Sequence, residues 1–367
     1  MSRIIILQPA LPVYRLDFFE RCAQLIAGDL TVYYSASNFH GLETKREAQP
    51  HWAKMLGPLH DFLPGLQWQT GALSIPIKRG DVLIVAGAPR CLSNLAVLML
   101  ARLRGAHTIW WGHYWSSTSK PWRYMLRLTL MRMSHSVVFY TDREVEECQL
   151  RMGRFAPARL SGLNNGINTD PVEACRSAYT ASARKPHLLF IGRMTEKAQT
   201  RLLLMALADP RLSDIRLEII GAGPEEASLR VQASELGIAA RVVWHGPITE
   251  EATIASVANR CALFVYPGSV GLSLIHGMAY GLPAVVHSNR WHHMPEISAL
   301  KPGVNGLTFE EGNAVSLAET IADALSDPIR LDRMSRESLE TVRDSFNTKD
   351  MSKRFVAAVK EFTNVAA

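Results

Sequence analysis

Short apolar runs alternate with stretches of helical periodicity along most of the chain, and this alternation constrains the fold more than any other feature. Apolar runs joined by amphipathic helices are the pattern of parallel strands with helical crossovers. The runs form two series of similar size. The first comprises 3–8, 30–35, 81–87, 107–112 and 136–141, and the second comprises 187–192, 215–221, 240–246, 261–268 and 282–288. The sequence therefore predicts an α/β protein with two Rossmann-like, doubly wound domains.

The domain boundary is expected in a stretch that is rich in alanine and serine and lacks strong periodicity. We predict an N-terminal domain over 1–172, a linker over 173–186 and a C-terminal domain over 187–346. Residues 347–367 are predicted to form a C-terminal helix that can pack back on the N-terminal domain. Ligands of doubly wound sheets bind beyond the carboxyl ends of the strands, so we expect a ligand cleft between the two domains.

Cysteine usage and hydropathy exclude two classes of protein. The five cysteines are scattered and include no CxxC pair, which argues against a disulfide framework or a zinc site and favours a reducing cytosol. The first residues read as a strand, not as a secretory signal. The longest apolar stretch, 92–103, is far shorter than the ~20 residues of a membrane-spanning helix. We therefore expect a protein that is not integral to a membrane.

Basic charge is concentrated in the first half of the chain. Residues 1–180 hold 20 Lys and Arg against 13 Asp and Glu, whereas residues 181–367 hold 20 against 21. Such asymmetry suits an anionic lipid surface or nucleic acid, or it is simply a solvated basic face. Segment 119–136 places Lys120, Arg123, Arg127 and Arg132 among aromatic and aliphatic residues, which suits anionic headgroups but also an ordinary amphipathic helix. Nothing resembles a nucleic-acid recognition helix or a base-stacking motif, so we expect no nucleic-acid partner.

The second series of strands offers a site for a phosphate. Strands end at Gly192, Gly221, Gly246 and Gly268, where a missing Cβ lets backbone approach a ligand, although each glycine alone could simply make a turn. A helix predicted to begin near Ser269 or Val270 would point unpaired amides at an anion. The candidate amide donors are those of Ser269, Val270, Gly271 and Leu272.

One cation is a candidate for the same phosphate. Arg193 follows a strand directly, and a guanidinium pairs with phosphate oxygens in a fork.

The segments "FIGRMTEK", "IIGAGPEE", "VVWHGPI", "YPGSVGLSLIHGMAYGLPAVV", "MPEI" and "VNGLTFEEGN" follow one another in a characteristic order. In this order they resemble the donor-binding half of glycosyltransferase family 4, and "LNNGINTD" and "WGHYW" resemble segments of its bacterial surface-polysaccharide members. The resemblance is strong over 187–312 and weaker before 130. It implies the GT-B fold and a retaining enzyme that needs neither metal nor other cofactor.

The resemblance also implies roles for individual residues. Arg193 would hold the donor diphosphate. The family's companion lysine would fall on Ala198; Lys197, one position earlier, can still reach the diphosphate by its flexible stem, and Arg201 is the alternative.

His113 would lie beside the donor sugar. Gly246 and Pro247 would lie at the nucleobase, and Glu296 would orient the adjacent loop. Arg15 is a candidate for an acceptor or phosphate contact, and Asn165 is a candidate for an acceptor-side contact.

The main departure from the family is a missing Glu-x7-Glu signature. Gly268 occupies its first position and His276 its second, where the family binds the nucleotide ribose. A histidine can still donate and accept hydrogen bonds, so His276 could replace that glutamate. Alternatively His276 packs against the sheet, or the protein is degenerate. His292 and His293 replace two glycines of a further motif, but no spacing supports a metal site.

These observations predict an enzyme that moves a sugar from a UDP- or GDP-linked donor to a hydroxyl of a glycan that is lipid-linked. The process would be biosynthesis of bacterial lipopolysaccharide, capsule or exopolysaccharide. The protein would be cytoplasmic and would bind peripherally to the anionic inner face of the cell membrane. A nucleotide-sugar epimerase or hydrolase and a non-catalytic nucleotide-sugar or glycan-lipid binding protein are the alternatives.

Overall fold

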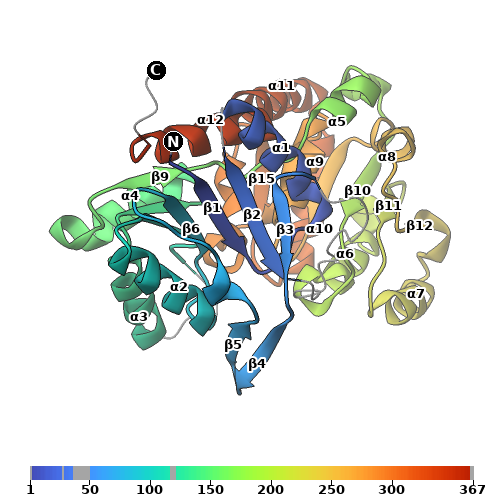
Figure 1. Cartoon of the computed structure of the whole chain (residues 1–367). Coiled ribbons are helices and arrows are strands. Elements are labelled where there is room, and N and C mark those ends of the chain that lie inside the picture. The colour runs from blue at the N-terminus through green and yellow to red at the C-terminus, as the bar shows by residue number, and fades with distance from the viewer. Residues whose placement is uncertain (1, 27–28, 36–49, 116–120, 364–367) are drawn as a thin grey trace. The chain divides into compact units, whose positions relative to one another are not determined.

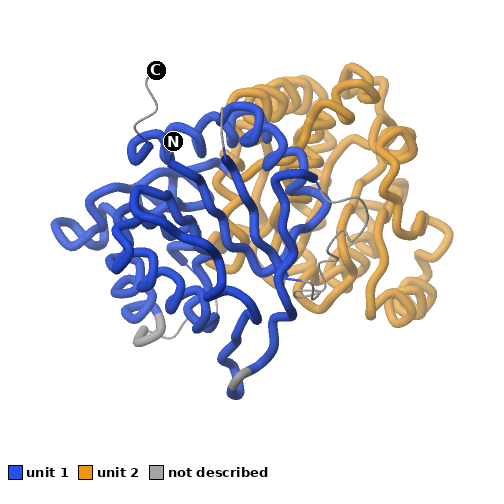
Figure 2. The backbone as a smooth tube through the Cα atoms, in the orientation of Figure 1, with its two compact units in different colours: residues 1–164, 348–367 blue, residues 165–347 orange. Residues whose placement is uncertain are grey.

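Parallel strands form the centre of each of two units in the computed structural model of the chain. The structure describes residues 2–26, 29–35, 50–115 and 121–363. Unit 1 comprises Met1–Asn164 and Thr348–Ala367, and unit 2 comprises Asn165–Asn347 (Figure 2). The chain therefore leaves unit 1 once and returns to it for its last helix.

Unit 1 is built on a seven-stranded parallel sheet in the order β3-β2-β1-β6-β7-β8-β9 (Figure 1). The strands are β1 (Ile4–Gln8), β2 (Leu30–Ser35), β3 (Ala53–Leu56), β6 (Val82–Ala86), β7 (His107–Trp111), β8 (Ser136–Phe139) and β9 (Leu160–Gly162). A separate antiparallel hairpin consists of β4 (Leu59–Leu63) and β5 (Leu66–Gln69). The helices are α1 (Leu16–Leu25), α2 (Leu92–Leu103), α3 (Pro121–Met131), α4 (Asp142–Met152) and α12 (Thr348–Lys360).

Strand β1 shows why the strands of unit 1 are apolar on both sides. Ile4 and Ile6 lie in a core that also holds residues of α1 and α12, whereas Ile5 and Leu7 lie in a core with residues of α2, α3 and α4. Side chains alternate between the faces of a strand, so a strand covered on both faces needs a continuous apolar run. The sheet is thus doubly wound, as the sequence predicts.

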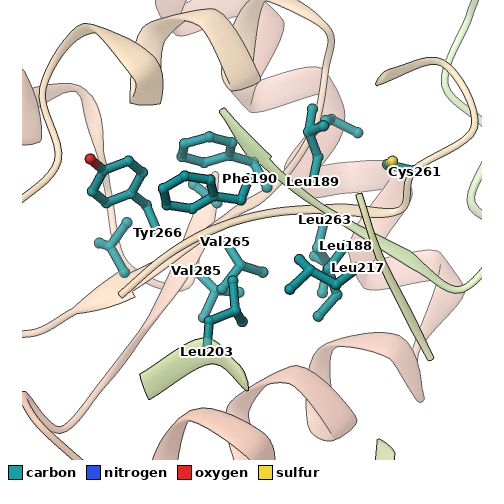
Figure 3. Packing of buried hydrophobic residues seen from close by; sticks show 14 of the residues in the cluster. Leu188, Leu189, Phe190, Leu203, Leu217, Cys261, Leu263, Val265, Tyr266 and Val285 are labelled. Atoms are coloured by element: carbon teal, nitrogen blue, oxygen red, sulfur yellow. The ribbon is translucent and has the colours of Figure 1, made fainter. Parts of the chain in front are cut away.

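Unit 2 is built on a six-stranded parallel sheet in the order β12-β11-β10-β13-β14-β15. The strands are β10 (His187–Ile191), β11 (Arg216–Ile220), β12 (Val242–Gly246), β13 (Leu263–Tyr266), β14 (Ala284–His287) and β15 (Gly306–Phe309). The helices are α5 (Asp170–Cys175), α6 (Thr200–Leu207), α7 (Glu226–Glu235), α8 (Glu251–Ala258), α9 (Leu272–Ala279), α10 (Ala314–Leu325) and α11 (Pro328–Asp344). Figure 3 shows part of the core, where the rings of Phe190 and Tyr266 stack with centroids 4.8 Å apart.

The strand order of unit 2 reverses between β10 and β13. Strands β11 and β12 continue outward from β10, and β14 and β15 continue outward from β13. The loops that follow β10 and β13 therefore leave the sheet on either side of a topological switch point. Ligands of open α/β sheets bind at such a point. The loops that carry Arg193 and Gly268 are these two loops.

Each of the ten predicted apolar runs contains a strand, and each strand is at most a few residues shorter than the predicted run. Strands β3, β9 and β15 and the β4–β5 hairpin were not predicted. Strands β3 and β9 are the two edges of the unit 1 sheet and β15 is an edge of the unit 2 sheet. In each of them at least half of the residues are not buried, so they lack the continuous apolar run that marks the central strands.

The predicted boundary and linker need correction. The division falls between Asn164 and Asn165, and residues 173–186 belong to unit 2. Side-chain hydrogen bonds fix this stretch: Tyr179 donates to the carbonyl of Ala262 at 2.8 Å, and the amide of Ala181 donates to Asp332 at 2.7 Å. Such contacts leave no periodic signature in the sequence.

Helix α12 belongs to unit 1. Met351 and Phe355 lie in the same core as Phe18 of α1 and Trp111 of β7. None of the helices in the described ranges combines the length and the apolar character needed to cross a membrane.

Candidate functional site

Two exposed cations lie on the loop that follows β10, at the switch point of unit 2. Arg193 comes two residues after the end of β10, and Lys197 lies in a single 3-10 turn, Glu196–Ala198. Neither side chain forms a hydrogen bond or ion pair with another described residue. Arg201, the alternative to Lys197, donates to Ser228 Oγ at 2.7 Å and is thus held on α7. Arg193 and Lys197 are therefore available for an anion.

Helix α9 begins at Leu272 with Gly271 as its N-cap, two or three residues later than predicted. The preceding amides are bonded elsewhere: that of Ser269 donates to the carbonyl of Lys197 at 2.9 Å, and that of Val270 donates to Nδ1 of His293 at 3.2 Å. The amides of Gly271 and Leu272 donate to no acceptor within the described residues. Of the four predicted amide donors, these two remain open to a ligand.

The loops after β10 and β13 touch through their backbones. A Cβ on Gly268 would lie 2.1 Å from the carbonyl oxygen of Lys197, and a Cβ on Gly192 would lie 3.0 Å from the ring of Tyr266. Only glycine fits at Gly268 without moving the neighbouring loop. This contact brings the turn of Lys197 against the loop that leads into α9, so the predicted cations and the helix N-terminus form one site.

His293 holds the loop before α9 from its other side. Its Nδ1 accepts from Val270, its Nε2 donates to the carbonyl of His287 at 2.9 Å, and its ring stacks on the ring of His287 at 3.6 Å. Burial and the neighbouring His287 lower the pKa of His293 to about 4. The ring is therefore neutral at pH 7, as an acceptor at Nδ1 must be.

Asn165 and Glu296 lie together, although 131 residues separate them. Nδ2 of Asn165 donates to Glu296, whose carboxylate also lies close to Gly271 at the start of α9. Glu296 is 4% exposed. Both residues are thus beside the site, at the point where the chain enters unit 2. Glu296 is placed to orient the loop before α9.

His276 lies one turn into α9 and contacts α8. Its Nε2 is 2.9 Å from Oε1 of Glu251, and the hydroxyl of Tyr280 bonds the same oxygen. His276 is therefore held by α8, and its Nε2 is not available to a ligand. No local sequence pattern connects Glu251 with α9, so the contact is not predictable from the sequence alone.

Gly246 ends β12 with φ +71°, a conformation that favours glycine, and Pro247 follows exposed on the surface. The preceding His245 donates to Glu218 at 2.6 Å, and the same buried carboxylate accepts from His187 and Arg260. Burial disfavours its ionisation, but the hydrogen bonds from Arg260 and His245 prevail and lower the pKa of Glu218 to about 2. Glu218 is the only carboxylate in the apolar run 215–221. This feature could have predicted a buried ionised group.

In unit 1, His113 follows β7 and stacks on Tyr140 with ring centroids 4.2 Å apart. Its side chain is 36% exposed, and its Nδ1 lies 3.9 Å from Glu144, beyond hydrogen-bonding distance. Burial of the Nδ1 edge, together with Arg127 and Arg15, lowers the pKa of His113 well below its usual 6.5. The ring is therefore neutral at pH 7 and partly exposed.

Arg15 is buried among aromatic rings. Its guanidinium lies 5.5 Å from the ring centroid of Trp111 and 5.8 Å from that of Tyr140, and it donates to the sulfur of Met351. Cation–π contacts of this kind fix the side chain. The structure therefore places Arg15 next to Tyr140, on which His113 stacks. A contact of Arg15 with an acceptor or a phosphate stays a prediction.

In the part of the chain that the structure describes, no three His, Cys, Asp or Glu side chains are grouped so that they could hold a metal ion. His287, His292 and His293 are close in sequence, but His292 bonds Glu311 at 2.6 Å and His293 bonds backbone groups. That the reaction needs no metal or other cofactor stays a prediction.

The sequence of the chain is similar to a protein family model and to individual proteins. Residues 173–341 match the family model "Glycosyl transferases group 1". The lipopolysaccharide core biosynthesis glycosyltransferase LpsE of Rhizobium meliloti is 23% identical over 198 residues, which are 53% of this chain and 56% of the relative. The lipopolysaccharide 1,6-galactosyltransferase of Salmonella typhimurium is 29% identical over 130 residues, 34% of this chain and 35% of the relative. The chain thus spans about half or less of the length of these relatives.

Solved structures agree with the fold over almost the whole chain. The lipopolysaccharide outer core galactosyltransferase WaaB superposes with a TM-score of 0.71 and 14% identity, covering 98% of this chain and 99% of that one. The Anabaena protein Alr3699/HepE, solved with UDP and glucose, superposes with a TM-score of 0.68 and 13% identity, covering 98% and 100%. The chain therefore has the GT-B fold of glycosyltransferases, and its residues 173–341 are similar to glycosyl transferases group 1.

Proposed function

We propose that the protein is a glycosyltransferase that takes a sugar from a nucleotide-sugar donor bound to unit 2. The observation that carries this proposal is the grouping of Arg193 and Lys197 with the open amides of Gly271 and Leu272. A leaving nucleoside diphosphate gains negative charge as the glycosidic bond breaks, and cations and amide dipoles aimed at it lower the barrier. The match to glycosyl transferases group 1 supports the same activity.

For the donor we propose a UDP-linked sugar, with a GDP-linked sugar as the alternative. The support is that the Anabaena structure of the same fold holds UDP. The base would lie at Gly246 and Pro247, next to the start of α8.

We further propose that transfer occurs with retention and without a metal ion. Arg193, Lys197 and the start of α9 would carry the charge that a divalent cation carries in other enzymes, and the leaving phosphate would accept the proton of the acceptor hydroxyl. The neutral ring of His113 would hydrogen-bond a hydroxyl of the sugar. In the proposed mechanism no side chain of the protein acts as a nucleophile.

The test is a thermal-shift screen of UDP, GDP, ADP and CMP and of their common sugar conjugates. A ligand that binds only the native state raises the melting temperature. We expect one diphosphate family to stabilise the native protein and to lose its effect on Arg193→Ala. No stabilisation by any of them in a folded sample would contradict the proposal.

Activity with the selected donor completes the test. The anomeric configuration of the product, read by NMR, checks retention, and an unchanged rate in EDTA checks metal independence. Donor that is consumed at the same rate with and without a glycan acceptor would identify a hydrolase instead.

For the acceptor we propose a hydroxyl of a lipid-linked glycan in surface-polysaccharide biosynthesis, at the cytoplasmic face of the membrane. The names of the relatives LpsE and WaaB, both concerned with lipopolysaccharide, support this class. Helix α3 supports contact with an anionic membrane: Met125 and Leu126 are 59% and 46% exposed, and the guanidinium of Arg132, just after the helix, lies over the exposed ring of Phe155. Lys120, part of the predicted basic segment, lies outside the described residues.

Sedimentation with vesicles tests the membrane contact. We expect the native protein to sediment with vesicles that contain phosphatidylglycerol and to remain in solution with phosphatidylcholine alone. Met125→Asp combined with Leu126→Asp should abolish sedimentation. The control Val231→Asp, at an exposed position of α7 in unit 2, should not. Equal sedimentation of all three proteins would contradict a role for α3.

A further inference from the structure

Glu251, the first residue of α8, brings a carboxylate to the flank of α9. Its Oε1 accepts from Nε2 of His276 at 2.9 Å and from the hydroxyl of Tyr280. His276 lies in α9 and Tyr280 is its C-cap, and both side chains reach Glu251 at the start of α8. The hydroxyl of Tyr280 also lies 3.4 Å from the carbonyl of Glu251. One carboxylate oxygen is therefore fixed by two donors.

The second oxygen of Glu251 is open. Oε2 accepts no hydrogen bond from any residue in the described ranges, and the side chain is 21% exposed. Burial alone would raise the pKa of Glu251, but the hydrogen bonds from His276 and Tyr280 outweigh it and lower the pKa. The group is thus ionised at neutral pH and can act only as an acceptor.

The distance from the phosphate-binding amides suits the next part of a nucleotide. His276 is four residues after Leu272, which corresponds to about 6 Å along a helix. In a nucleoside diphosphate the ribose directly follows the α-phosphate, and its vicinal hydroxyls are two donors with a short separation. An ionised carboxylate with a free oxygen is the acceptor that such a diol requires.

We propose that Glu251 binds the ribose hydroxyls of the donor nucleotide and that His276 and Tyr280 are positioning residues that hold its carboxylate. This inference rests on the proposed function, because it places a nucleoside diphosphate at Arg193 and α9. It moves the diol contact from α9, where the sequence suggested His276, to the start of α8. It also makes the site selective for ribonucleotides over deoxyribonucleotides.

The experiment combines a change in the ligand with a change in the protein. Affinities for UDP and 2′,3′-dideoxy-UDP are measured by titration calorimetry on the native protein, Glu251→Gln and the control Glu250→Gln. If the screen selects GDP, the corresponding guanosine pair is used. Glu250 is the neighbouring exposed carboxylate, so its variant has the same change in charge. The melting temperature of each unliganded variant checks that it folds.

We expect the native protein and Glu250→Gln to bind UDP about 10- to 100-fold more tightly than the dideoxy analogue, the range for hydrogen bonds to a charged group. Glu251→Gln should bind the two within a few-fold of each other. Positioning is tested separately: the amide of His276→Gln can still donate to Glu251 and should keep the preference, whereas His276→Leu should lose most of it.

Two outcomes would overturn the inference alone. One is a native protein that binds UDP and its dideoxy analogue equally, and the other is a Glu251→Gln variant that keeps the full preference. In either case Glu251 would only tie α8 to α9, and the proposed function would stand. A native protein that binds neither UDP nor GDP would overturn the proposed function and this inference together.

Discussion

At the scale of single residues, the site depends on which polar groups already have partners. Arg193 and Lys197 are exposed and unbonded within the described residues, so their charge is available to a ligand. The sequence predicts that the amide of Val270 is also available to a ligand, but in the structure this amide donates to His293. A predicted ligand contact is therefore usable only where the fold has not already satisfied it.

If Arg193 stabilises charge mainly in the transition state, as we propose, Arg193→Ala should lower turnover at least about 100-fold. The melting temperature should stay close to that of the native protein, since the side chain is exposed and forms no hydrogen bond or ion pair with another described residue. Initial rates and thermal unfolding give both quantities. Arg216→Ala, at the exposed opposite end of the unit 2 sheet, is the control and should leave the rate unchanged. Equal rates for the two variants would contradict the role of Arg193.

The lowered pKa of His293 predicts a loss of stability in acid. Because the folded-state pKa, about 4, lies below the usual 6.5, the unfolded chain binds a proton before the folded one does as the pH falls. The stabilisation is complete above pH 6.5 and is lost between pH 6.5 and 4, at most about 3 kcal/mol in the free energy of unfolding.

His293→Asn removes this titration, while the amide oxygen can still accept from Val270. Urea unfolding at several pH values should therefore show a shallower pH dependence for His293→Asn than for the native protein. His51→Asn, at an exposed position of unit 1, should follow the native slope. Identical slopes for all three proteins would mean that His293 titrates normally.

At the scale of elements, the site is made by two loops that meet at the switch point of the unit 2 sheet. The strand order places them side by side, and the missing side chain of Gly268 lets their backbones touch. The start of α9 is set by the same contact, because Lys197 and His293 take the amides before Gly271. The loops therefore position the cations and the helix N-terminus as one group.

Gly268→Ala should separate these loops. The added Cβ would lie 2.1 Å from a backbone oxygen, so we expect a loss of about 1–3 kcal/mol in unfolding free energy and weaker donor binding. Gly246→Ala is the comparison: it has a left-handed φ of +71° but open space around the added carbon, and should cost about 1 kcal/mol. Chemical denaturation and nucleotide titration measure both effects. A Gly268→Ala variant no less stable than Gly246→Ala would contradict the close contact.

At the scale of the whole molecule, the chain forms two units with separate cores, and its last helix belongs to the first unit. Phe355 of α12 packs its ring edge-on to Phe18, with centroids 5.5 Å apart, and lies 5.8 Å from Trp111. Unit 1 is thus completed only after unit 2 has been translated. Each unit buries its own sheet on both faces.

Phe355→Ala should destabilise unit 1 by about 3–5 kcal/mol, the usual cost of removing a fully buried phenylalanine. Hydrogen exchange followed by mass spectrometry should then show faster exchange in peptides from residues 1–164, although the change is at position 355. Peptides from 165–347 should change little. Phe309→Ala, buried in unit 2, is the matched control and should show the reverse pattern. Faster exchange throughout both units in either variant would mean that they unfold as one.

The sequence by itself determined the two parallel sheets and the place of Arg193 just after a strand. Apolar runs and the residues at strand ends are local features, so they can be read without knowing which elements pack together. The edge strands were missed because at least half of the residues in each are not buried, so none of them is a continuous apolar run. The linker was misplaced because residues 173–186 are held by side-chain contacts with distant parts of unit 2.

Only the tertiary structure decided which groups of the site are open and which are used. The bond from His276 to Glu251 spans 25 residues and that from Asn165 to Glu296 spans 131, so no window of the sequence contains either pair. The amide of Val270 likewise donates to His293, which lies 23 residues further along the chain. Hydrogen-bond partners depend on how the elements pack in three dimensions, and this packing is what distinguishes an available donor or acceptor from a satisfied one.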